Sequence, residues 1–163
     1  MVLGMTLTAY TILHVVLSII GIVTGLIAVG GLLAGHRLPV TTAIFLITTL
    51  ATTLGGFLFP FNGFTPAIGV GIVSTIVLLV TIAARYIFRL HGSWRRVYVG
   101  GAVIALYLNS FVLVAQSFRK VPSLNIYAPT GSETPFAITQ GVVLAVFVVL
   151  GILSVWRFRP AVG

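Results

Sequence analysis

Five long apolar stretches, separated by short polar segments, constrain this chain more than any other feature. A membrane-crossing helix needs about 20 consecutive, mainly apolar residues. Stretches of that kind occupy residues 7–34, 40–59, 67–88, 97–118 and 136–156. The segments between them are far shorter than the roughly 40 residues that an unaided domain needs. The sequence therefore predicts an all-α, polytopic membrane protein, a single bundle of five transmembrane helices.

The composition supports lipid as the main solvent and excludes several kinds of chemistry. The 163 residues are 59% hydrophobic and only 6% charged, whereas a soluble domain is about a quarter charged. The chain has no cysteine, and Glu133 is its one acidic residue against nine Lys and Arg. These counts exclude disulfides, thiolate metal sites, paired-carboxylate hydrolysis and an Asp-completed catalytic triad.

The positive charges predict how the bundle is oriented. Cytoplasmic loops of membrane proteins carry an excess of Lys and Arg. No positive residue precedes the first span, and that span is about twice as long as the apolar region of a signal peptide. The predicted amino terminus is therefore outside and the carboxyl terminus cytoplasmic. This arrangement puts Arg119 and Lys120 outside and the other seven positive residues inside: Arg37, Arg85, Arg89, Arg95, Arg96, Arg157 and Arg159.

Four inner arginines are expected to contact anionic lipid headgroups: Arg85, Arg89, Arg95 and Arg96. They lie close in sequence to Tyr86, Trp94 and Tyr98, the pattern of an interfacial aromatic belt. The same pattern makes the bilayer, and not nucleic acid, the expected partner of the basic residues. The uncharged, aromatic loop at 59–66 leaves open a re-entrant dip into the membrane.

Small and polar side chains mark the faces on which membrane helices pack. In the first span Tyr10, His14 and Ser18 share a stripe with two glycines, Gly21 and Gly25. In the fourth span Asn109 and Gln116 share a stripe, and Asn109 near mid-membrane is expected to hydrogen-bond a neighbouring helix. The second span carries a broad hydroxyl face, which predicts close packing or the wall of a wetted conduit: Thr41, Thr42, Thr48, Thr49, Thr52 and Thr53.

Depth in the membrane groups the remaining polar residues into one candidate site. Its members are expected near the outer surface, between the first, fourth and fifth spans. His14 can bond a quinone carbonyl or ligate haem, and Glu133 is expected to form an ion pair with Arg119 or Lys120 that closes the outer loop. The candidate ligand-binding residues are Tyr10, His14, Asn109, Gln116, Arg119, Lys120, Glu133 and Gln140.

Two segments carry a resemblance to a known group of proteins. The segment from Lys120 to Phe136, which includes Ala128-Pro-Thr-Gly-Ser-Glu-Thr-Pro, and the segment Tyr-Leu-Asn-Ser-Phe-Val-Leu-Val-Ala-Gln at 107–116 are similar to segments of small, uncharacterised multi-pass proteins of bacterial inner membranes. The resemblance covers the last four spans. It implies a bacterial inner-membrane location and no particular activity.

Three function classes stay open on the sequence alone. The first is a non-enzymatic membrane component that binds a partner protein or a small lipophilic ligand through the outer cluster, within a larger complex or a homo-oligomer. The second is a small channel or transporter subunit that uses the threonine face and the Asn109–Gln116 stripe. The third is a redox subunit with quinone or haem at His14. An independent enzyme is the least favoured class, because no nucleophile and base lie in a recognisable motif.

Overall fold

The computed structural model describes residues 1–160, and long helices make up most of this range. Five helices are long and apolar enough to cross a membrane, one of them formed by α3 together with the π-helical turn η1. This agrees with the number of spans expected from the sequence. The elements are α1 (Leu7–Leu33), α2 (Pro39–Gly56), α3 (Pro66–Ile82), η1 (Ala83–Ile87), α4 (Trp94–Lys120), α5 (Pro122–Asn125) and α6 (Thr134–Arg157).

Local sequence signals explain where these helices start. The side chains of Thr6 and Thr65 accept hydrogen bonds from backbone amides three residues later, at the starts of α1 and α3, as capping residues do. Proline occupies the first turn of α2, α3 and α6, where its missing N–H costs nothing. When η1 is counted with α3, the observed bounds differ from the expected ones by at most three residues: α2 stops at Gly56 and not at 59, and α4 begins at Trp94 and not at 97.

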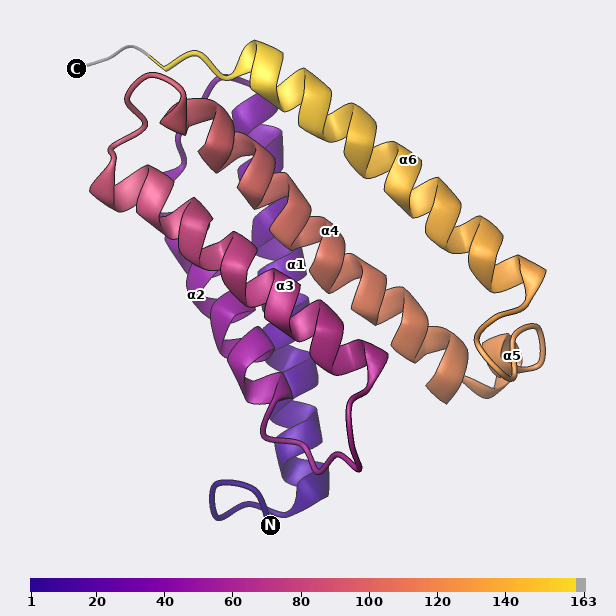
Figure 1. The fold of residues 1–163 in the computed structure, drawn as a ribbon. Helices are drawn as coiled ribbons and strands as arrows, with labels where there is room; N and C mark the ends of the chain where they lie inside the picture. The colour runs from indigo at the N-terminus through magenta and orange to yellow at the C-terminus, as the bar shows by residue number, and fades with distance from the viewer. Residues whose placement is uncertain (161–163) are drawn as a thin grey trace.

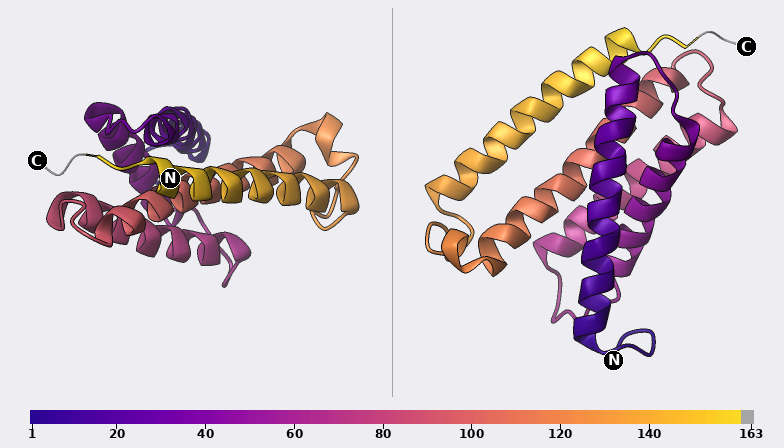
Figure 2. Two further views of the ribbon diagram at one scale, coloured as in Figure 1. Left: turned by 90° about the horizontal axis from the view of Figure 1, so that it is seen from above. Right: turned by 180° about the vertical axis from the view of Figure 1, so that it is seen from behind.

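The long helices form two layers that cross each other (Figures 1 and 2). One layer contains α1 and α2, which run side by side, and the other contains α3, α4 and α6. In this second layer α4 lies between α3 and α6 and packs against both. Because α4 also packs against α1, it is the central helix of the fold.

The two ends of the bundle differ in charge and in chain connections. The arginine-rich end contains the α1–α2 and α3–α4 connections and the carboxyl end of α6. The amino-terminal end contains the start of α1, the α2–α3 loop and the segment with α5 between α4 and α6 (Figure 1). At the amino-terminal end the ribbons of α4 and α6 run away from α1 (Figure 2).

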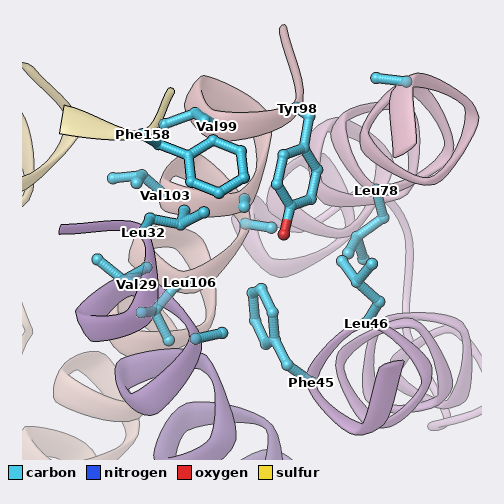
Figure 3. Close-up of a cluster of buried hydrophobic side chains, with 14 of the residues drawn as sticks. Val29, Leu32, Phe45, Leu46, Leu78, Tyr98, Val99, Val103, Leu106 and Phe158 are labelled. Atoms are coloured by element: carbon cyan, nitrogen blue, oxygen red, sulfur yellow. The ribbon is translucent and has the colours of Figure 1, made fainter. Parts of the chain in front are cut away.

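The apolar core lies in the arginine-rich half of the bundle. Each long helix contributes to it from the half that is nearer to that end. Figure 3 shows Phe45 of α2 and Leu106 of α4 facing the side chains of α1, with Tyr98 and Phe158 above them. The largest fully buried side chains include Leu32, Phe45, Leu46, Leu78, Tyr98, Leu106 and Phe158.

Two half-buried arginines hydrogen-bond neighbouring elements at the arginine-rich end. Arg85 donates to the Tyr98 hydroxyl at 3.0 Å and to the Arg37 carbonyl at 3.3 Å. Its guanidinium also lies over the Tyr98 ring, 5.1 Å from the centroid. Arg95 donates to the carbonyls of Val155, at 3.0 Å, and of Phe158. These bonds satisfy carbonyls at the end of α6 and before α2 that have no helical partner.

Candidate functional site

The amino-terminal half of the contact between α1 and α2 is lined by aromatic and polar side chains. The Tyr10 hydroxyl donates to the Gly55 carbonyl at 2.8 Å. Phe59 follows α2 and packs on both aromatic rings of α1, with centroid distances of 5.0 Å to Tyr10 and 5.2 Å to His14. A side chain at Gly55 would meet the tyrosine hydroxyl at 2.9 Å. The glycine therefore allows the two helices to approach each other here.

His14 is the one histidine of α1, and neither nitrogen of its ring hydrogen-bonds another described residue. The ring is half-buried, edge-on to Phe59, and near Gly55 and Gly56 of α2. His14 is thus positioned by packing while its hydrogen-bonding atoms stay available.

One turn deeper, α1 is joined to α4 by a pair of hydrogen bonds. The Ser18 hydroxyl donates to Oδ1 of Asn109 at 2.7 Å, and Nδ2 of Asn109 donates to the Ser18 carbonyl at 3.3 Å. This confirms the expectation that Asn109 bonds a neighbouring helix. The amide is nearly buried, so in lipid these bonds avoid the cost of an unpaired polar group.

Two buried hydroxyls of α2 lie on the face that contacts α1 and make no hydrogen bond. They belong to Thr49, which is 2% exposed, and to Thr52, which is 7% exposed. Threonines in helices commonly bond a carbonyl one turn earlier, as Thr48 does to Ile44 at 2.7 Å. At 3.6 residues per turn, Thr52 shares its face with Thr48 and Gly55. The unpaired hydroxyl of Thr49 therefore lies opposite Gly21 of α1, and that of Thr52 lies about one turn nearer to Gly55.

Gln140 lies at a different interface, between α4 and α6. Its side-chain amide donates to the Phe111 carbonyl of α4 at 3.0 Å. Nearby, the rings of Phe118 and Phe136 meet edge to face with centroids 5.6 Å apart. The other amide atom, Oε1, is buried without a partner. Gln140 thus joins α6 to α4 and does not contact the α1–α2 site.

The expected ion pair of Glu133 does not form. Its carboxylate accepts hydrogen bonds from the Thr130 hydroxyl at 2.7 Å, the Thr130 amide at 2.9 Å and the Ser132 amide at 3.0 Å. These bonds hold its pKa at about 2. Within the described chain the carboxylate pairs with neither Arg119 nor Lys120. The acid does close the loop before α6, but through local backbone and hydroxyl donors, which lie nearer to it in sequence than either cation.

The structure therefore divides the predicted cluster. Tyr10 and His14 face α2, and α6 does not contribute to their surroundings. Arg119 and Lys120 are exposed at the end of α4, and Gln116 is half-buried one turn before them. The sequence analysis missed Gly55 and Phe59 as neighbours of His14. Their position directly after the threonine face was the available signal, because it puts them at the same end of the bundle as the start of α1.

The four arginines assigned to lipid headgroups also differ from one another. Arg85 and Arg95 are half-buried and bonded within the protein, as described above. Arg89 and Arg96 are exposed and make no hydrogen bond within residues 1–160. In the same range, no three His or Glu side chains come together in a way that could hold a metal ion. His14 is therefore the one histidine inside a span that a bound group could use.

Comparison with family models, with curated proteins and with solved structures gives no match to this chain.

Proposed function

We propose that this protein is a non-enzymatic integral membrane component that binds a small lipophilic ligand at the contact between α1 and α2, through His14. The observation that carries the proposal is the free pair of ring nitrogens on His14, held half-buried against Phe59 and the glycines at the end of α2. Ionisable residues within membrane spans are costly, and they usually mark functional sites.

The chemistry of the site favours a ligand with an apolar body and a carbonyl head, as in a quinone. A neutral imidazole has one donor and one acceptor nitrogen, so His14 can donate to such a carbonyl. Phe59 and the Tyr10 ring supply flat apolar surfaces beside it. The Tyr10 hydroxyl already donates to the Gly55 carbonyl, which leaves His14 as the principal polar contact for the ligand.

A conducting role has less support from the geometry. The polar row of α1 and α2 extends from Tyr10 to the level of Gly21, at mid-membrane. Beyond that level a Cβ on Gly25 would lie 2.6 Å from Leu106 and 2.9 Å from Phe45, so apolar side chains fill the space between the helices. A channel would need this core to open, whereas a binding site does not.

The proposal is tested by quinone binding to the purified protein in mild detergent, with decylubiquinone as the probe and equilibrium dialysis as the measurement. We expect saturable binding to the wild type. His14→Phe keeps the ring and its packing on Phe59 but removes both nitrogens. We expect this variant to bind at least about fivefold more weakly, because a buried hydrogen bond lost on one side costs about 1–3 kcal/mol.

His91→Phe is the matched control, since His91 lies in the exposed α3–α4 connection at the other end of the bundle. Equal affinity of the wild type and His14→Phe, or no saturable binding to either, contradicts the proposal. The absorption spectrum of the same wild-type sample separates the remaining redox alternative, because a Soret band would identify haem in place of quinone at His14.

Location and partners complete the proposal. The excess of arginine at one end supports a cytoplasmic position for that end, with the amino terminus outside. The resemblance of residues 107–116 and 120–136 supports a bacterial inner membrane. Exposed Ile126 and Tyr127, in the segment between α4 and α6, offer an outer surface on which a larger complex or a second copy of the chain could pack.

A further inference from the structure

A groove runs between α4 and α6 on the surface that would face lipid. Its volume is about 390 Å³ and its walls are almost entirely apolar. Gly100 widens it, because a Cβ at this position would meet no atom within 4 Å. The lining residues include Gly100, Ile104, Tyr107, Leu144, Ile152 and Trp156.

Along α6 the groove is about as long as one leaflet of a bilayer is thick. On α6 the lining extends from Leu144, near the middle of the helix, to Trp156 at its arginine-rich end. At 1.5 Å per residue this is about 18 Å, close to the roughly 15 Å of half a hydrocarbon core. On α4 the lining likewise extends from the middle of the helix toward the same end. A single acyl chain of that leaflet would fit along it.

Helical spacing puts a positive charge one turn beyond the groove lining of α4. Arg96 precedes Gly100 by four residues, so it continues the groove-lining stripe of α4 by one turn. It is exposed and makes no hydrogen bond within the described residues, whereas neighbouring Arg95 is bound to the end of α6. Trp156 is 65% exposed beside this end, as aromatic residues at headgroup level are.

We propose that this groove is a binding site for an anionic phospholipid, with one acyl chain between α4 and α6 and the headgroup phosphate on Arg96. The charge of Arg96 and the leaflet-long apolar walls argue for a lipid over a protein helix. The site is separate from the one proposed at His14, which lies between α1 and α2 at the opposite end. It also distinguishes Arg96 from Arg89, which is exposed but lies outside the groove, and from Arg95, which is bonded to the end of α6.

The test is native mass spectrometry of the protein in mild detergent, with phosphatidylglycerol and phosphatidylcholine of identical acyl chains in equal amounts. We expect the wild type to retain phosphatidylglycerol in preference. Arg96→Gln should lower the ratio of bound phosphatidylglycerol to phosphatidylcholine about fivefold, the factor expected for one arginine at a membrane surface. Arg89→Gln removes the same charge from an exposed residue outside the groove and should leave the ratio unchanged.

The acyl chain is tested separately. Gly100→Leu fills the groove and should reduce the retention of both lipids. Gly141→Leu is the matched control, because a Cβ there also meets no atom within 4 Å, but this glycine of α6 does not line the groove. If Gly100→Leu does not fold by circular dichroism, Ile152→Trp fills the same groove from α6.

Several results would overturn the proposal. One is equal retention of the two lipids by the wild type, and another is an equal loss of preference in Arg96→Gln and Arg89→Gln. Unchanged retention in the groove-filling variants would also overturn it. So would a dimer that Gly100→Leu dissociates while lipid retention stays constant, because the groove would then hold a second copy of the chain. None of these outcomes depends on quinone binding at His14.

Discussion

At the scale of single residues, the carboxylate of Glu133 orders the turn before α6 by accepting hydrogen bonds within it. Thr130 supplies a hydroxyl and an amide donor and Ser132 supplies a second amide. These bonds form to the charged carboxylate, so they lower its pKa from 4.5 to about 2. Since the folded pKa is the lower one, the bonds stabilise the turn fully above the unfolded value and are lost as the pH falls through about 2.

This gives a titration prediction with an unambiguous signal. Because Glu133 is the only acidic side chain in the sequence, selective ¹³C labelling of glutamate yields one side-chain carboxyl resonance. We expect its midpoint near 2 for the wild type. Thr130→Ala removes the hydroxyl donor and should raise the pKa toward its usual range, whereas Thr139→Ala, a turn into α6, should not. A wild-type midpoint at the ordinary glutamate value would show that the three bonds are not formed.

At the scale of helices, the spans could be predicted from the sequence because apolar length is a property of each segment alone. The packing stripes were predictable for the same reason, and the bond between Asn109 and Ser18 joins two of them. The helix that would face His14 was not predictable. A stripe tells which side of a helix is buried, but not which neighbour covers it, and α2 covers it where α6 was expected.

Neither the π-helical turn nor the hydrogen-bond partners of Glu133 could be predicted, because no sequence pattern marks either of them. η1 follows α3 without any proline or glycine in Ala83–Ile87 to mark it. Its Arg85 bonds Tyr98 and the Arg37 carbonyl, which are distant in sequence. Such a turn depends on tertiary contacts and not on local propensity. For Glu133, charge pairing suggested cations, but donors within three residues were closer.

A close approach of three helices predicts that alanine substitutions at two glycines of α1 change the stability of the protein in opposite directions. A Cβ at Gly25 would meet Leu106 at 2.6 Å and the Phe45 ring at 2.9 Å, whereas one at Gly30 would meet nothing within 4 Å. Alanine is the better helix former, so Gly30→Ala should stabilise the protein by about 0.4–1 kcal/mol. Gly25→Ala should instead destabilise it by about 1–3 kcal/mol, because the core must shift.

Unfolding in mixed micelles, followed by circular dichroism as the fraction of sodium dodecyl sulfate increases, measures both glycine variants. The two proteins have the same composition, so any difference comes from the surroundings of the added methyl group. If Gly25→Ala is as stable as Gly30→Ala, the three helices α1, α2 and α4 do not meet as closely as the structure has them.

At the scale of the whole molecule, the bundle is packed unequally along its length. The arginine-rich half contains the apolar core and the internal bonds of Arg85 and Arg95. The other half contains the free nitrogens of His14 and the unpaired hydroxyl of Thr52. One half is thus closely packed, and the other half has polar groups without hydrogen-bond partners. A packed half that positions such groups suits a binding protein. The orientation of this asymmetry then determines from which side of the membrane the His14 end is reached.

That orientation gives the last prediction. The chain contains no cysteine, so single cysteines can be introduced without removing any. Ser123 lies in α5 at the amino-terminal end and Ser93 lies just before α4 at the arginine-rich end; both are exposed and neither side chain is used in a hydrogen bond. With the arginines in the cytoplasm, a membrane-impermeant maleimide should label Ser123→Cys in intact cells. Ser93→Cys should react only after permeabilisation. The reverse pattern would place the His14 end on the cytoplasmic side, and equal labelling of both would mean that the chain inserts in two orientations.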